Sequence, residues 1–450
     1  MNLRKRWSLP DSPVDRNIRL LYFEMFWSAI LGGAITFNEA FAIRLGASNA
    51  LVGLLSSAPP LIVVTLSIPA ARLLERQTDR RPYLLWSLLL MRLGYIVVAL
   101  LPLLAPAYTA NWLVAWLVTL NVPATLFNAG WMPLMADILP ERRRAFVFSR
   151  RNIIYFAVTA GVTFVAGSWL NATAFPSNYQ TLYAFGAAAA LVGCATLEKL
   201  TIPPSTVPPH GKPTRRRRIP IPTVSLRAVR SEVREEIRGH RSFWNLTVSS
   251  FAYTFGIWMS SPLFALYWVR ELNADDGWIG LNSGVKSLAV VGGFLLGERL
   301  IRRYGFKRVL ARMGPLSSLY PFLMALVPDL TFILFAGVMI GFINPCLDLS
   351  RTNLLLKLAP RERRATYTSF WITIMNAGAV LAPLLSVALA DRIGLRWALF
   401  VAATVRLSGA LLLLALKIEE PPEEPPAAIE QATGPTAPEG EAAPVVKAAR

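Results

Sequence analysis

Charged and amide side chains inside long apolar stretches are the residues of this chain that could do chemistry. One such stretch carries Asn344, Asp348 and Arg351, and a helix places all three on one face. Asp348 and Arg351 are three residues apart, so they can form an ion pair. A charge at mid-membrane costs at least about 2.5–3.5 kcal/mol on insertion scales. We therefore expect this face to line a water-filled cavity or to meet a partner.

A second polar face lies in the apolar stretch 277–300. Asn282 and Lys286 are four residues apart and share one side of a helix. Lys286 lies near the middle of the stretch and could reach Asp348. The two charges could share a proton or hold a substrate anion, or they could form a static salt bridge. The spacing leaves both interpretations open.

The first half of the chain offers its own candidates. Asn38 and Glu39 lie near one end of the first apolar stretch, and we expect Glu39 to bind a proton or a cation there. Glu24, near the other end of the stretch, is expected only to cap loops. Asn128 follows Asn121 by seven residues on the same helix face, which predicts a hydrogen-bond donor in the cavity.

Two arginines in apolar stretches are harder to interpret. Arg92 and Arg406 fall in the third and the last stretch. Their long side chains can snorkel towards the lipid headgroups. Snorkelling or lipid contact explains both residues as well as function does.

Twelve apolar stretches must position these side chains. Each is about 20 residues or longer, enough to cross a hydrocarbon core of about 30 Å as a helix. The chain of 450 residues is 54% hydrophobic and only 16% charged. We predict an all-α integral membrane protein with these spans: 17–44, 49–71, 83–105, 110–136, 151–171, 179–198, 243–270, 277–300, 308–328, 330–356, 367–390 and 395–417.

The distribution of the positive charge gives the expected topology. The net charge is +19, and the basic residues collect in alternate connections between the apolar stretches. Almost none lie in the other connections, which contain Arg44, Arg270, Arg392 and Arg396. This asymmetry predicts that both termini are cytoplasmic, and it argues against a nucleic-acid partner. We expect a multi-pass protein of a bacterial inner membrane whose basic loops contact anionic headgroups.

The two halves of the sequence repeat one plan. Arg72 to Arg81 recurs 227 positions later as Arg299 to Arg308, and Gly53 falls on Gly280 at the same offset. Such a repeat indicates two six-helix units related by a pseudo-twofold axis. The expected segments are a terminal segment 1–16, bundles at 17–198 and 242–417, a basic linker at 199–241 and a disordered tail at 418–450.

The basic linker contains two further features. Arg215 to Arg218 form a run of four arginines, which we expect to anchor to anionic headgroups. Apolar residues at helical spacing over 223–238 predict a cytoplasmic amphipathic helix.

The basic turns resemble the signature of the major facilitator superfamily. After the second stretch, Ala71, Glu75, Arg76, Thr78, Arg80 and Arg81 match its pattern of small, acidic and basic residues. Asp137 also stands at a usual acidic position. The resemblance implies twelve helices in two halves that rock about a midplane site. It also implies that residues at the basic turns gate the cytoplasmic mouth: Glu75, Arg76, Arg80, Arg81, Asp137, Arg144, Arg303, Gly305, Lys307, Arg308 and Arg364.

The resemblance implies secondary active transport of a small organic solute. Carboxylates in the spans suggest coupling to protons, and no nucleotide-binding loop is present. The alternatives are an exporter of lipids or hydrophobic drugs on the same fold, and a membrane sensor or assembly factor that no longer transports. We expect a monomer with no enzyme activity, no cofactor and no metal site. Cys194 and Cys346 are expected to be core residues.

Overall fold

The computed structural model describes residues 12–75, 77, 79–201, 239–360, 363–416 and 418, without the side chains of Glu75, Glu141, Ala145, Arg364, Ala365 and Thr366. Outside this part of the chain lie the expected helix at 223–238, the run Arg215 to Arg218, Arg76, Thr78 and the expected tail from residue 419 on.

Every regular element in the described ranges is a helix. The first half contributes α1 (Pro13–Ile35), α2 (Asn38–Arg44), α3 (Asn49–Glu75), α4 (Arg81–Leu104), η2 (Pro106–Tyr108), α5 (Thr109–Thr119), α6 (Asn121–Ile138), α7 (Glu141–Ala172) and α8 (Ser177–Leu197). The second half contributes α10 (Arg241–Leu266), η4 (Tyr267–Glu271), α11 (Asp276–Tyr304), α12 (Phe306–Leu326), α13 (Leu330–Leu358), α14 (Arg364–Ile393) and α15 (Leu395–Ala415).

All twelve predicted spans are therefore helical, and the expected membrane fold is confirmed. Eleven of the described segments are long and apolar enough to cross a membrane. The remaining helix, α10, is 26 residues long. Its serines and threonines lower its hydropathy, yet it packs inside the bundle against α14 and α15.

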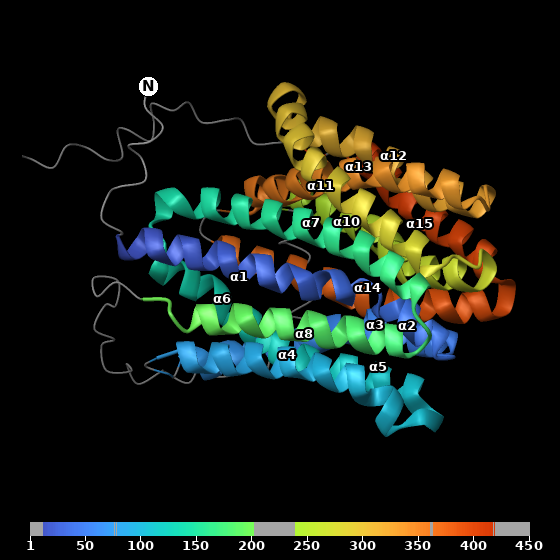
Figure 1. Ribbon diagram of the computed structural model, residues 1–450. Coiled ribbons are helices and arrows are strands. Elements are labelled where there is room, and N and C mark those ends of the chain that lie inside the picture. Colours follow the sequence, from blue (N-terminus) through green and yellow to red (C-terminus); the bar gives the residue numbers. More distant parts are fainter. Residues whose placement is uncertain are drawn as a thin grey trace, which may run out of the picture.

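The spans lie side by side along one direction (Figure 1). The start of α4 and the connection between α6 and α7 lie at the left end in that view, and the connection between α11 and α12 lies at the top. These connections carry Arg81, Arg144 and Lys307, and we call their end of the bundle the basic end. The right end holds the connections 45–48 and 272–275, and we call it the short-loop end.

Helix packing repeats between the two halves of the chain. α1 packs against α7 and α8, α4 against α6 and α8, and α3 against α6. In the same order, α10 packs against α14 and α15, α12 against α13 and α15, and α11 against α13. The repeat in the sequence is therefore also a repeat in packing.

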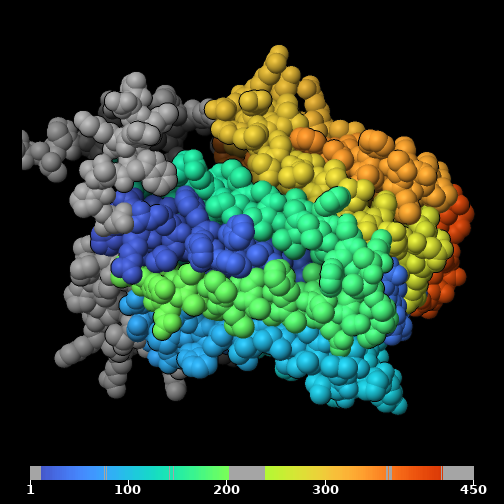
Figure 2. Space-filling view, in the orientation of Figure 1, coloured from blue at the N-terminus to red at the C-terminus, as the bar shows by residue number. Residues whose placement is uncertain are grey.

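The two halves meet along α7 and α11 and along α3 and α14. The space-filling view shows α7 lying directly beside α11 (Figure 2). A Cβ atom at Gly167 would lie 2.6 Å from the carbonyl oxygen of Asp276, and one at Gly280 would overlap the carbonyl oxygen of Thr163. Gly53 of α3 likewise lies against Val387 of α14. These small residues let the helix backbones approach closely, as in other membrane bundles.

Three spans are not continuous α-helices. The first breaks at Thr36 and Phe37, and the fourth breaks at Leu120. Pro123 explains the second break, because it has no N–H to donate to the carbonyl of Thr119. The seventh span ends in a π-helical turn, η4. Irregular backbone at membrane depth is tolerated where protein or a water-filled cavity covers it.

The glycine contact between α7 and α11 can be tested directly. Gly280→Ala should destabilise the fold by about 1–3 kcal/mol, because the added methyl group forces the two backbones apart. Thermal unfolding of the purified protein in detergent measures this effect. Gly161→Ala is the matched control on α7, since no atom lies within 4 Å of its Cβ position. Equal melting temperatures for the two variants would contradict the close-contact interpretation.

Candidate functional site

A cavity opens where the first and fourth spans break. Polar side chains at the two breaks line the cavity, and Pro59 of α3 also lines it. Its volume is about 380 Å³, and its lining residues are Ile35, Thr36, Asn38, Glu39, Leu55, Pro59, Tyr95, Leu117, Val118 and Asn121. The cavity therefore combines an apolar wall with a few polar groups, as small-molecule sites do.

Glu39 is the charged residue of this cavity. Its Oε1 accepts a hydrogen bond from the hydroxyl of Ser56 at 3.2 Å. Within the described part of the chain, no arginine or lysine forms an ion pair with Glu39. Asn38 is held in place, because the hydroxyl of Tyr183 donates to its Oδ1 at 2.8 Å. The carboxylate is thus oriented but not neutralised, so it can accept a proton or a cation.

The predicted polar face of α13 is present. Arg351 donates to Asp348 at 2.8 Å and to the hydroxyl of Thr254 on α10 at 3.1 Å. The Asp348 side chain is 64% exposed, although it lies ten residues before the end of its helix. Asn344 is half-buried one turn earlier. A carboxylate this exposed inside a span is expected to face water and not lipid.

The candidates on α11 have other surroundings. Asn282 is buried, and its Oδ1 lies against Gly337 of α13, so it belongs to a helix contact. Lys286 is half-buried. No ion pair joins Lys286 to Asp348 in the part of the chain that the structure describes, where Asp348 pairs with Arg351 instead.

The two candidate asparagines of the fourth span, Asn121 and Asn128, lie in different surroundings. Asn121 lines the cavity, and its amide donates to the carbonyl of Leu117, which the helix break leaves without a helical partner. Asn128 is exposed on α6 and is not among the residues that line this cavity.

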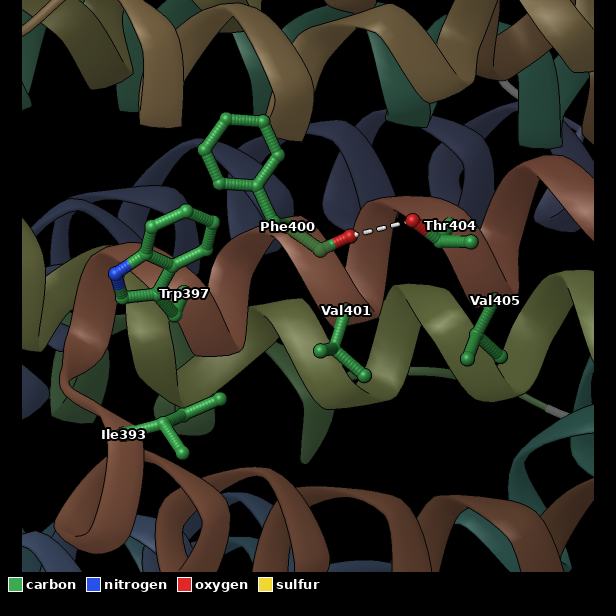
Figure 3. Close-up of a pocket in the computed structure, with 6 residues that line it drawn as sticks. All are labelled: Ile393, Trp397, Phe400, Val401, Thr404 and Val405. Carbon is green, nitrogen blue, oxygen red and sulfur yellow. Dashed lines mark hydrogen bonds between the residues drawn. The ribbon is translucent and has the colours of Figure 1, made fainter.

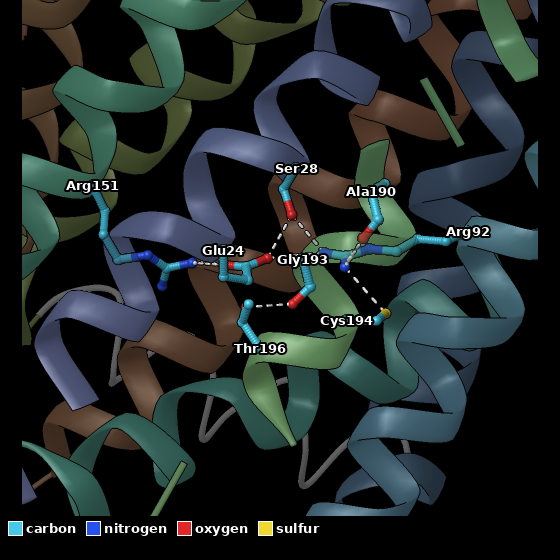
Figure 4. A network of polar contacts seen from close by, with 8 residues as sticks. All are labelled: Glu24, Ser28, Arg92, Arg151, Ala190, Gly193, Cys194 and Thr196. Carbon is cyan, nitrogen blue, oxygen red and sulfur yellow. Dashed lines mark hydrogen bonds and ion pairs between the residues drawn. The ribbon is translucent and has the colours of Figure 1, made fainter. Parts of the chain in front are cut away.

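The expectation that Glu24 only caps loops is wrong, because Glu24 lies in a buried ion-pair network that the sequence did not reveal. Glu24 accepts from Arg92 at 2.8 Å through one carboxylate oxygen and from Arg151 at 2.9 Å through the other. Figure 4 shows the carboxylate between the two guanidinium groups. Arg151 also lies 4.5 Å above the ring of Trp131. The three charged residues are each at most 5% exposed, so the network fastens α1, α4 and α7 together.

The lipid interpretation of Arg92 and Arg406 is wrong, because both side chains are buried. Arg406 donates to the hydroxyl of Tyr253 at 3.0 Å, and Tyr253 bonds with Ser317 at 2.6 Å. The sequence signal was a charge in each of several apolar stretches. Pairing such charges between helices requires knowledge of which helices are neighbours.

The residues of the basic turns satisfy helix ends. Arg144 donates to the carbonyls of Ala136 and Leu139 at the end of α6, as a cation near a helix C-terminus should. Arg81 donates to the carbonyl of Leu200, and Lys307 to that of Ile418. Gly305 has φ of +79°, a left-handed conformation that favours glycine, and it joins α11 to α12.

The other predicted gating residues remain untested. Arg303 lies over the ring of Tyr304, and Arg80 precedes α4. Arg308 and Asp137 lie within the described part of the chain, where neither forms an ion pair with the other half. Arg76 and the side chains of Glu75 and Arg364 are not described. The gating role of this set stays a prediction.

An apolar groove on α15 is a poor candidate for a polar solute. It is lined by Ile393, Trp397, Phe400, Val401, Thr404 and Val405 (Figure 3). The Thr404 hydroxyl already donates to the carbonyl of Phe400 at 2.9 Å. Trp397 is 63% exposed on this face, so the groove faces the lipid side of the bundle.

The sequence profile of the Major Facilitator Superfamily matches residues 21–253 and 246–449. The chain belongs to this superfamily. The matched stretches include both halves of the repeat, so the resemblance carried by the basic turns is confirmed. A search of curated protein sequences gives no match.

Solved transporter structures share the fold. A bacterial homologue of the human lysosomal transporter Spinster, inward-facing and unoccupied, gives a TM-score of 0.63 at 14% identity and covers 91% of this chain and 98% of its own. A mutant of the nucleoside transporter NupG gives 0.63 at 12% identity, with 89% and 99% covered. The xylose transporter XylE from E. coli, inward open, gives 0.62 at 12% identity, with 93% and 98% covered.

The buried network predicts a large effect of a small substitution. Glu24→Gln should destabilise the protein by about 3–5 kcal/mol, because it leaves two buried arginines without their counter-charge. Thermal unfolding in detergent measures the loss. Asp15→Asn is the control on the same helix, since Asp15 pairs with Arg143 where both are exposed. A Glu24→Gln variant as stable as Asp15→Asn would show that the network does not hold the helices together.

Proposed function

We propose that this protein is a secondary active transporter that moves a small organic solute by alternating access and couples the movement to protons. The observation that carries the proposal is the Glu39 carboxylate, which faces a cavity at two helix breaks with the Ser56 hydroxyl as its donor. Broken helices around a midplane site are how many secondary transporters hold substrate and coupling ion.

Glu39 suits the role of proton carrier. A carboxylate without a fixed cation can gain a proton when its cavity faces an acidic compartment and lose it when the cavity faces the other side. Asp348, by contrast, has a fixed counter-charge in Arg351, at 2.8 Å. The proposal therefore assigns proton binding to Glu39, and solute contact to Asp348, Arg351 and Lys286.

The solute class is a small polar molecule. The lining of the Glu39 cavity combines amide, hydroxyl and carboxylate groups with apolar side chains, and Asp348 is exposed inside its span. Similar solved structures include a D-xylose–proton symporter and a nucleoside transporter, both for polar solutes. We also propose that the basic end is cytoplasmic, in line with the distribution of arginines.

A ligand screen tests the solute class. The purified protein in detergent is heated with sugars, amino acids, organic acids, nucleosides and cationic drugs at pH 5.5 and 7.5. A ligand at 100 times its dissociation constant should stabilise the fold by about 2.7 kcal/mol. Loss of the shift in both Lys286→Ala and Asp348→Asn would support solute contact at these residues. No shift with any polar compound, in a folded protein, would contradict the solute class and favour a lipid-like substrate.

Proton coupling is tested in proteoliposomes loaded with the solute that the screen identifies. The wild-type protein should accumulate solute when a pH gradient of the correct sign is imposed. Glu39→Gln, which cannot exchange a proton, should lose accumulation but keep solute exchange without a gradient. Glu298→Gln is the control, because Glu298 forms a surface pair with Arg302. Accumulation by Glu39→Gln at the wild-type level would contradict the coupling role.

A further inference from the structure

Two arginines at the short-loop end bind across the interface between the two halves. Basic residues are rare at this end, and the arginines and lysines that would fix the orientation in the membrane lie at the other end. Arg44 and Arg270 therefore need another explanation. Arg44 ends α2, and Arg270 lies in η4, at the equivalent place of the other half. The Arg44 side chain donates to Asp276 and Ala274, and that of Arg270 donates to Asn49 and Ala47, so both arginines bond to the opposite half of the chain.

Arg44 forms hydrogen bonds with residues at the start of α11. Its Nε donates to Asp276 Oδ1 at 2.9 Å, and its Nη2 donates to the carbonyl of Ala274 at 3.1 Å. The Tyr179 hydroxyl, from α8 of the first half, donates to the same Asp276 oxygen at 2.8 Å. The Asp276 side chain is 7% exposed, so this arm is largely removed from water.

Arg270 forms equivalent hydrogen bonds with residues at the start of α3. Its Nη1 donates to Asn49 Oδ1, and its Nη2 donates to the carbonyl of Ala47. The Asn49 amide in turn donates to Asp391 at the end of α14. This arm is exposed, and among the described residues no carboxylate contacts the arginine directly.

The two arms are copies related by the internal repeat. Ala274 lies 227 positions after Ala47, and Asp276 lies 227 positions after Asn49, which is the offset of the repeat. Gly46 and Asn273 share that offset, and both have positive φ, +86° and +48°. Each turn therefore presents one carbonyl and one side-chain oxygen to an arginine of the other half.

The π-helical turn explains why Arg270 forms the second arm. At the repeat offset of 227 positions, the residue equivalent to Arg44 is Glu271, which is acidic. The α-helical turn is closed by a bond from Leu45 N to Phe41 O, whereas η4 is closed by one from Leu272 N to Tyr267 O and holds one more residue. The extra residue moves the register by one, so Arg270 takes the position of Arg44.

We propose that Arg44 and Arg270, with their acceptors, form a two-armed latch that keeps the short-loop end closed and must be released when that end opens. We call it the arginine latch. The inference rests on the proposed function, because it assigns these residues to a step of the transport cycle. The buried arm of Arg44, which has a carboxylate acceptor, is the stronger one, and the exposed arm of Arg270, whose acceptors are neutral, is the weaker one.

The experiment measures the latch without any solute. Spin labels are attached at Tyr108→Cys and Phe335→Cys, exposed positions on the two halves towards the short-loop end, in a background with Cys194→Ala and Cys346→Ala. Electron–electron distance measurements in lipid nanodiscs then report the fraction of molecules in which this end has opened.

Each arm should have its own effect. Arg270→Ala should raise the open-to-closed ratio about two- to fivefold, the range for one exposed charged contact. Arg44→Ala should raise it more than about tenfold, because Asp276 loses its buried cation. The exchange Arg44→Asp with Asp276→Arg should bring the ratio back towards that of the wild type. Size-exclusion chromatography confirms that each variant is folded.

Arg396→Ala is the matched control, since Arg396 is an arginine at the same end that, among the described residues, donates within its own half, to the carbonyls of Ala325 and Leu326. It should leave the ratio unchanged. Distance distributions of Arg44→Ala and Arg270→Ala that equal those of Arg396→Ala would overturn the latch. Opening of this end in the variants without transport of any solute would support the latch and contradict the proposed function instead.

Discussion

Every backbone N–H and C=O group inside a membrane must find a hydrogen-bond partner within the protein, and the structure follows from this constraint. Helices satisfy it span by span, so every regular element of the described chain is a helix. The exceptions are informative. The backbone breaks at Thr36 and Phe37 and at Leu120 lie beside the cavity that holds Glu39. Irregular backbone and an unneutralised carboxylate therefore occur together.

Charge obeys a related constraint, because a buried ion needs a counter-ion or a hydrogen-bonding partner. Glu24 satisfies two arginines at once, and Arg406 uses the hydroxyl of Tyr253 in place of a carboxylate. Glu39 and Asp348 differ from these residues. Glu39 has a hydroxyl as its donor, and Asp348 remains exposed despite its ion pair. The charges that hold the fold together are thus distinguished from the candidate functional charges by their partners or by their exposure.

The internal repeat gives the two halves one packing scheme, and the interface between them shows where the symmetry is used and where it is broken. Gly53 and Gly280 occupy equivalent positions, and both allow a close contact between the halves. The arginine latch is symmetric in its carbonyl acceptors but has Asp276 on one side and Asn49 on the other. Symmetry of geometry with asymmetry of charge gives one strong and one weak contact at the same end.

The amino-acid sequence alone determined the number and approximate limits of the spans, the repeat and the pairing of Asp348 with Arg351. These depend on local hydropathy and on spacing within a helix, which the sequence states directly. The tertiary structure decided the rest. Glu24, Arg92 and Arg151 are far apart in sequence and meet only because α1, α4 and α7 are brought together. The pairing of Arg270 with Asn49 depended on one extra residue in a π turn, which shifts the register without any mark in hydropathy. Contacts between helices depend on which faces pack together, and the pattern of a single helix does not contain that information.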